Sequence, residues 1–271
     1  MTDFFRILGR KSAAKKQFGD SHWKSWSWSE PDFAPALDAI RSDPAFAEKH
    51  GCEIWSTRTK KVWRIDLPAG LGGYSVAYKA GKPGRTARYL VMPGPIDREM
   101  INFRLFESLG IPMVKLLAGG ETRRGPVLKE NFLITRFAEG YVSGKELMPS
   151  GDDAPRRPDP ETLRGFLAFN MPLIARLHDA GCCHRAFRPY NIMMRRGADG
   201  KTDCLWLDVA SCVFYPLPAF AMRGMFLHDL GRFFRDLQLD ADQLRFAAEA
   251  YLQNTRRPFM SAGKLIALLT R

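Results

Sequence analysis

The spacing of apolar residues changes once along the chain, near residue 138. Before this point the chain carries short runs typical of β-strands, at 53–56, 62–67, 74–79, 114–118 and 131–137. One helical segment, 96–109, interrupts them and ends at Gly110 and Pro112. After this point apolar residues recur at intervals of three and four, as in amphipathic helices. These patterns predict an α+β fold, with a β-rich first half that contains one main helix and an α-rich second half.

Local signals divide the chain further. We expect a basic and aromatic N-terminal extension over 1–44, the β-rich part over 45–137 and the α-rich part over 138–271. Pro172 lies within a helical stripe and is expected to kink or restart that helix. His228 and Asp229 are expected to open a helix, and Asp240 with Gln243 predicts a capping box at the start of the next one.

The charge of the chain restricts its partners. Lys and Arg number 41 against 29 acidic residues, a net charge of +12. This excess favours an anionic partner, such as a nucleic acid, a nucleotide, a phospholipid or a phosphorylated glycan. No recognisable nucleic-acid motif is present, so we expect no nucleic acid among the partners.

Cysteine use and hydropathy indicate the compartment. The five cysteines include no C-x-x-C pair, which argues against a zinc site and a disulfide framework and favours a reducing compartment. The apolar run 212–222 is too short to span a bilayer, and the first residues lack the apolar core of a signal peptide. We therefore expect a cytoplasmic protein. The basic and aromatic residues 1–30 suggest peripheral contact with an anionic membrane, or simply an extension docked on the protein.

Two groups of residues carry the chemistry of phosphoryl transfer. Lys79 ends an apolar strand, where a lysine can reach the phosphates of a nucleotide if a carboxylate holds it, and Glu99 on the next helix is the candidate carboxylate. His184 and Arg185 begin a loop in which Asn191 follows seven residues after the histidine. An amide oxygen at that position can bind Mg²⁺.

Three further residues extend this second group. Arg188 is placed to neutralise the transferred phosphoryl group, and Asp208 ends an apolar strand where it can bind Mg²⁺ across the phosphates. Asp229 is expected to brace the loop. Each match alone is weak, but all occur in the order that ATP-dependent phosphoryl transfer requires.

These residues give the chain a family resemblance. From about Glu53 to Leu252 it resembles the bacterial lipopolysaccharide core sugar kinases, which phosphorylate Kdo or heptose, including a basic turn at 57–61 where protein kinases have a glycine-rich loop. The resemblance implies a two-lobed protein-kinase-like fold, ATP and Mg²⁺ as cofactors, and work at the cytoplasmic face of the inner membrane on a core oligosaccharide or lipid A precursor.

The resemblance also assigns roles to residues. It implies a phosphate clamp made by Lys79 and Glu99, metal ligands in Asn191 and Asp208, and catalytic-loop roles for His184 and Arg188. It further implies an adenine-contacting hinge formed by Thr135, Arg136, Phe137 and Ala138. We expect Lys79, Asn191 and Asp208 to converge on one magnesium-bound triphosphate.

The chain departs from the family at one position. Ala186 stands where the family has the aspartate that accepts the proton of the sugar hydroxyl. Three readings stay open: a kinase in which another group orients the acceptor, a nucleotide-binding pseudokinase acting as scaffold or regulator in envelope biogenesis, and an alanine introduced to trap a substrate complex. A small-molecule phosphotransferase of the aminoglycoside or choline type is a more distant alternative, disfavoured by the basic turn.

Overall fold

The computed structural model describes residues 24–43, 45–82, 87–90, 94–149, 159–215, 219–256 and 260–269. The chain forms two compact units. One comprises the described residues up to Arg104 together with Val114–Glu139, and the other comprises Leu105–Met113 with the described residues from Gly140 onward. The first is rich in strands and the second in helices, which confirms the predicted α+β class.

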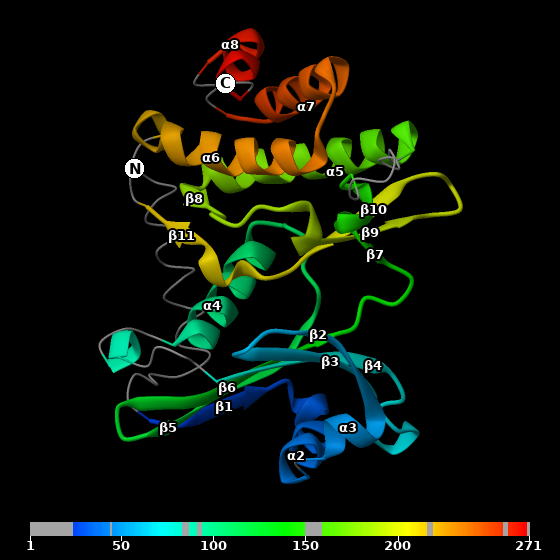
Figure 1. Ribbon diagram of the computed structural model, residues 1–271, viewed down its shortest axis with the longest axis vertical. Coiled ribbons are helices and arrows are strands. Elements are labelled where there is room, and N and C mark those ends of the chain that lie inside the picture. Colours follow the sequence, from blue (N-terminus) through cyan, green and yellow to red (C-terminus); the bar gives the residue numbers. More distant parts are fainter. Residues whose placement is uncertain are drawn as a thin grey trace. The chain divides into compact units, whose positions relative to one another are not determined.

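The N-terminal unit is built on one antiparallel sheet (Figure 1). Its strands are β1 (Trp26–Ser29), β2 (Gly51–Ser56), β3 (Lys60–Asp66), β4 (Ser75–Gly81), β5 (Leu116–Arg124) and β6 (Val127–Arg136). They lie in the order β1-β5-β6-β4-β3-β2, so β1 and β2 are the edge strands. The run expected at 114–118 begins as a strand only at Leu116 but continues to Arg124, where β5 and β6 form a hairpin.

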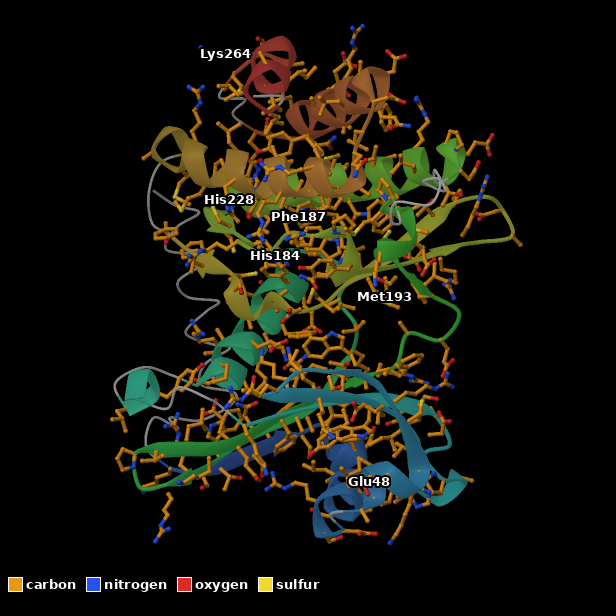
Figure 2. The ribbon with its side chains drawn as sticks, viewed as in Figure 1. Glu48, His184, Phe187, Met193, His228 and Lys264 are labelled. Carbon is orange, nitrogen blue, oxygen red and sulfur yellow. The ribbon has the colours of Figure 1, made fainter. Side chains whose placement is uncertain are left out.

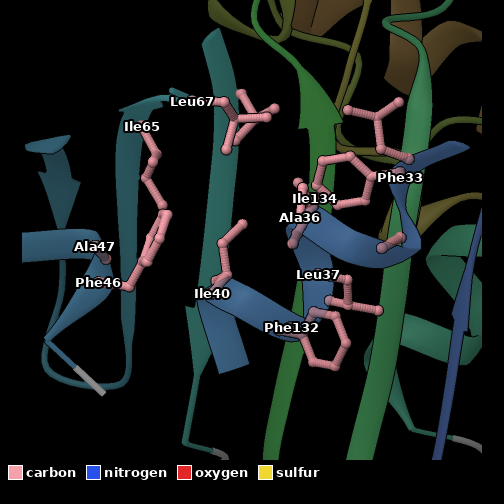
Figure 3. Close-up of a cluster of buried hydrophobic side chains, with 13 residues drawn as sticks. Phe33, Ala36, Leu37, Ile40, Phe46, Ala47, Ile65, Leu67, Phe132 and Ile134 are labelled. Atoms are coloured by element: carbon pink, nitrogen blue, oxygen red, sulfur yellow. The ribbon is translucent and has the colours of Figure 1, made fainter. Parts of the chain in front are cut away.

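Helices α2 (Ala34–Ser42) and α3 (Phe46–His50) cover one face of this sheet (Figures 1 and 3). Phe33, Leu37 and Ile40 recur at helical spacing and bury against Ile134 and its neighbours on the strands. Residues 24–43, which the sequence predicts as part of an extension, therefore belong to the packed core and, through β1, to the sheet. Residues 1–23, on which the membrane prediction largely falls, lie outside the described part of the chain.

Helix α4 (Pro95–Ser108) carries Glu99 to the opposite face of the sheet. The predicted bounds 96–109 are confirmed to within a residue, and Gly110, with φ of +70°, adopts the left-handed conformation that ends a helix. Gly119 on β5 makes room for α4, because a Cβ there would lie 2.3 Å from the Sδ of Met100.

The C-terminal unit is mainly helical, as predicted. Its helices are α5 (Pro160–Asp179), α6 (Ala219–Leu237), α7 (Ala241–Gln253) and α8 (Ala262–Leu269). Its short strands are β7 (Val142–Ser143), β9 (Ile192–Arg196) and β10 (Thr202–Trp206) in one sheet, and β8 (Cys182–Cys183) with β11 (Val213–Phe214) in another. Three single-turn helices also position the site: η4 (Gly144–Leu147), η5 (Pro189–Asn191) and η6 (Val209–Ser211).

Three expectations about these helices can be compared with the structure. Of the two alternatives for Pro172, a restart is excluded: α5 runs through it, because a proline removes one backbone N–H while the apolar face on both sides stays buried. Asp229 does not open a helix but lies in the middle of α6, which begins just after Pro218. Asp240 and Gln243 form the predicted capping box of α7. No helix within the described ranges has the length and apolar character needed to cross a membrane.

Candidate active site

The first group of candidate residues is an ion pair in the N-terminal unit. The Nζ of Lys79 on β4 lies 3.0 Å from both carboxylate oxygens of Glu99 on α4. The side chain of Glu99 is only 2% exposed and that of Lys79 19% exposed. A buried carboxylate needs a partner, so the pair fixes the ammonium group at one place on the sheet.

The register of the sheet decides which face carries Lys79. Its cross-strand partners are Val62 on β3 and Leu133 on β6. Side chains of paired residues point to the same face, and the alternating residues Val76 and Tyr78 point to the core covered by α2. Lys79 therefore projects from the face that α2 and α3 leave uncovered.

The segment 135–138, predicted as the hinge, ends the sheet. Thr135 is buried in β6, the N–H of Arg136 donates to the carbonyl of Lys115 at 2.8 Å, and the N–H of Phe137 donates to that of Ser75 at 3.0 Å. The boundary between the two compact units falls just after this segment, between Glu139 and Gly140. Ala138 therefore leads directly out of the N-terminal unit.

The loop that begins at His184 is held by one buried carboxylate. Asp229 on α6, 1% exposed, accepts hydrogen bonds from the backbone N–H groups of His184 at 2.7 Å and Arg185 at 2.8 Å. His178 completes the cluster, with Nε2 3.4 Å from Asp229 and Nδ1 2.8 Å from the hydroxyl of Tyr251. Arg185 has a φ of +60°, a conformation that costs a non-glycine residue about 1–2 kcal/mol. Asp229 thus fixes the start of the loop in a strained shape.

The imidazole of His184 is enclosed by rings. It is 1% exposed and packs against Phe106, Phe187 and Trp206, with ring centroids about 6 Å apart. Figure 2 labels His184 and Phe187. Burial holds the pKa of His184 below its ordinary value, so the ring is neutral at pH 7. A side chain so enclosed reaches no substrate. His184, expected as a catalytic residue, therefore acts through packing and through its backbone.

Asn191 and Asp208 lie at the same end of the β9–β10 hairpin. The N–H of Leu207 donates to the carbonyl of Asn191 at 3.0 Å, which places Asp208 one residue beyond that bond. The Nδ2 of Asn191 donates to the carbonyl of Ala186 at 2.9 Å, so Oδ1 is the side-chain atom able to bind a cation. Asp208 has a φ of +55°, in the left-handed region that Asp adopts more readily than most non-glycine residues, and such conformations cluster at functional sites.

These two residues suit Mg²⁺ better than a metal held by protein alone. Among the described residues no three His, Cys, Asp or Glu side chains gather to hold a metal ion. Mg²⁺ commonly binds one or two protein oxygen ligands and completes its shell with water and substrate phosphates. One amide oxygen and one carboxylate fit that pattern.

Arg188 is engaged in a way the sequence does not reveal. Its guanidinium forms a two-point ion pair with Asp236 on α6, in which Nη2 lies 2.8 Å from Oδ1 and Nε contacts Oδ2. Sequence reasoning missed Asp236, although it follows Asp229 by seven residues and therefore lies on the same side of α6, two turns later. The cation expected at the phosphoryl group is thus already paired with an internal carboxylate.

The cysteines beside the loop are structural. Cys182 and Cys183 are buried free thiols, and burial raises the pKa of Cys183 to about 12. A thiol with such a pKa carries almost no thiolate at neutral pH and is chemically inert.

Comparisons with known proteins identify the fold and the family of the chain. A solved structure described as WaaP in complex with acyl carrier protein matches with a TM-score of 0.59 and 17% identity, over 90% of this chain and 96% of that one, which shows a shared kinase fold. No curated protein matches the sequence. The family model described as lipopolysaccharide kinase (Kdo/WaaP) matches residues 86–251, more than half of the chain. The chain therefore belongs to the lipopolysaccharide kinase (Kdo/WaaP) family.

Proposed function

We propose that this protein is an ATP- and Mg²⁺-dependent kinase that phosphorylates a Kdo or heptose hydroxyl of the lipopolysaccharide core or a lipid A precursor. The observation that carries the proposal is the ion pair between Lys79 and Glu99. A buried carboxylate that orients a strand lysine is the device by which kinases bind the α- and β-phosphates of ATP. Family membership supplies the class of acceptor.

Each candidate residue then has a physical role. Lys79 binds phosphate oxygens and Glu99 holds its ammonium group, while residues 135–138 contact the adenine. Asn191 and Asp208 hold Mg²⁺, which when bound neutralises charge on the phosphates. His184 and Asp229 position the loop through the backbone. In the proposed reaction the γ-phosphorus of ATP exchanges its bond to the β-phosphate oxygen for one to the sugar oxygen, and the proton of the sugar hydroxyl passes to solvent.

The replacement at Ala186 limits the rate without preventing binding. A positioned general base typically contributes about 10²–10⁴ to a rate, so its loss slows turnover by that order. Phosphoryl transfer passes through a loose transition state and depends mainly on positioning and electrostatics. Binding of the nucleotide needs neither the base nor the acceptor.

A nucleotide-binding pseudokinase is the second candidate, and one observation favours it. Beyond the missing carboxylate at Ala186, the cation of the loop is paired with Asp236 and must leave that ion pair to reach a phosphate. Of the two groups that the loop would supply to the transferred phosphoryl group, the general base is therefore absent and the cation of Arg188 is held in an ion pair. Such a protein would act as a scaffold or regulator in envelope biogenesis.

Partners and location follow from the same proposal. A lipopolysaccharide acceptor resides in a membrane, so we expect a cytoplasmic protein that contacts the anionic inner membrane peripherally. The structural relative was solved with acyl carrier protein, and a protein partner of that kind is a further expectation for this chain.

Nucleotide binding is tested by thermal unfolding. Mg·ATP at 100 times its Kd should raise the Tm by about 5–10 °C, from the free energy of a saturating ligand and the usual slope for a protein of this size. Lys79→Met and Asp208→Asn should abolish the shift, whereas Asp199→Asn, in the exposed β9–β10 turn, should preserve it. An equal shift in all four proteins would contradict the assigned roles.

Transfer of radiolabelled phosphate from ATP to deacylated core oligosaccharide separates the two candidates. Label in the oligosaccharide with the wild type, lost in Asp208→Asn, supports the kinase. Label only after Ala186→Asp supports the pseudokinase. Absence of both binding and transfer would refute both.

A further inference from the structure

We propose that Trp55 is an aromatic platform on which the base of the nucleotide stacks. The inference rests on the proposed function and names a residue that sequence reasoning did not single out. It follows from the register of β2, from a bulge in that strand and from the exposure of the indole ring.

The register places Trp55 in one row with the phosphate-binding lysine. Trp55 pairs with Val62 on β3, and Val62 pairs with Lys79 on β4. Paired side chains project from the same face of a sheet, so Trp55 shares with Lys79 the face opposite α2 and α3. With neighbouring strands about 4.8 Å apart, Trp55 and Lys79 are about 10 Å apart across the sheet. One nucleoside triphosphate can reach both.

A β-bulge turns Trp55 toward this face. The pairing passes from Glu53 with Trp63 directly to Trp55 with Val62, which leaves Ile54 as an extra residue. In an unbroken register Trp55 would oppose Lys61 and would point to the other face, the side of Trp63 and Tyr78. Bulges re-aim side chains in this way and are frequent next to active sites.

The surroundings of Trp55 differ from those of Trp63, the next tryptophan along the chain. The ring of Trp63 stacks on Tyr78 at 5.7 Å and is covered by the ammonium of Lys61 at 5.5 Å. Trp55 is 51% exposed, and within the described ranges its ring has no aromatic or cationic partner. An indole exposed this far, in the same row as Lys79, is accessible to a planar ligand. Stacking of a base on an aromatic side chain is insensitive to base identity, so Trp55 itself should contribute about equally to the binding of ATP and of GTP.

A lipid surface is the competing occupant. Ile54 is 49% exposed, and Arg58, Lys60 and Lys61 lie in or beside the following turn, so Ile54 and Trp55 together could contact an anionic bilayer. Such a surface would use both apolar side chains. Base stacking uses only Trp55, because the bulge takes Ile54 out of the row that contains Lys79.

The test uses the full-length chain and three variants: Trp55→Ala, Trp55→Phe and the matched control Ile54→Ala. Calorimetry gives the Kd of each protein for Mg·ATP and for Mg·tripolyphosphate, which lacks a base. We expect Trp55→Ala to weaken ATP binding about 5- to 100-fold and to leave tripolyphosphate binding unchanged. Trp55→Phe and Ile54→Ala should bind ATP within about 3-fold of the wild type, given the size of a stacking contribution.

Three outcomes would overturn the proposal. Equal ATP affinity in the wild type and Trp55→Ala removes Trp55 from the site while leaving the proposed function intact. Parallel loss of binding to phosphatidylglycerol vesicles in Ile54→Ala and Trp55→Ala, with ATP affinity unchanged, assigns the surface to lipid. A wild type that binds neither ATP nor tripolyphosphate refutes the proposed function itself.

Discussion

Replacing Asp229 by asparagine should loosen the loop on which the proposed chemistry depends. The carboxylate accepts the N–H groups of His184 and Arg185 through different oxygens, at 2.7 and 2.8 Å, and it is 1% exposed. Asparagine has the same shape but only one acceptor oxygen, because its NH₂ group can only donate. At least one of the two backbone N–H groups therefore loses its acceptor.

The size of the effect follows from these contacts. A hydrogen bond to a charged group contributes about 1.5–3 kcal/mol, and a buried donor left without a partner costs a similar amount. We expect Asp229→Asn to lower the free energy of unfolding of the C-terminal unit by about 2–4 kcal/mol. Arg185 should then relax from its φ of +60°, because the bond that holds it there is weakened.

Urea unfolding and amide hydrogen exchange measure the two effects. The midpoint of unfolding should fall, and the amides of His184 and Arg185 should exchange faster than those in the middle of α5. Glu249→Gln, which removes a carboxylate from the exposed side of α7, should change stability by less than about 0.5 kcal/mol. If Asp229→Asn were as stable as this control, with unchanged exchange at both amides, the bracing role of Asp229 would be refuted.

Two other perturbations bear on the same unit. Burial lowers the pKa of His178 and of His184 below 6.5, so the unfolded state binds more protons than the folded state as the pH falls past 6.5. The contribution of these two residues to the free energy of unfolding should therefore be full above that pH and decline below it. Urea unfolding from pH 8 to 5.5 should show this decline, and the decline should be shallower in His184→Phe. A midpoint of urea unfolding that did not depend on pH would contradict this. Gly144→Ala places a Cβ 2.4 Å from the carbonyl oxygen of Pro189, so η5 must shift. We expect the free energy of unfolding to fall by about 1–3 kcal/mol and Mg·ATP to bind more weakly. Gly224→Ala on α6, whose Cβ meets nothing within 4 Å, is the control and should not destabilise.

Local patterns were sufficient for most of the elements. The capping box at Asp240 and the bounds of α4 depend on residues near one another in sequence, so the sequence predicts them closely. The place of residues 24–43 in the sheet and core is not predicted by local pattern, because it depends on distant partners. Trp26 pairs with Glu121, and Phe33 buries against strands that follow later in the chain.

In the candidate site, too, some properties follow from local sequence and others depend on distant partners. The order of Lys79, Glu99, His184, Asn191 and Asp208 is a property of the sequence, and it was enough to indicate ATP-dependent phosphoryl transfer and the family. The sequence did not indicate which individual side chains are buried, paired or exposed. That His184 is enclosed by rings, that Asp236 engages Arg188 and that a bulge turns Trp55 toward the face of Lys79 all depend on segments brought together by folding.

The physical reason is the range over which each property is decided. Spacing within a helix or strand fixes which residues share a face, and a motif preserves the residue types that a reaction needs. Burial, ion pairing and side-chain direction depend on neighbours distant in sequence, such as Arg188 and Asp236, 48 residues apart. The sequence alone thus determined the class of fold and of chemistry, and only the tertiary structure decided which of the candidate groups are free to perform it.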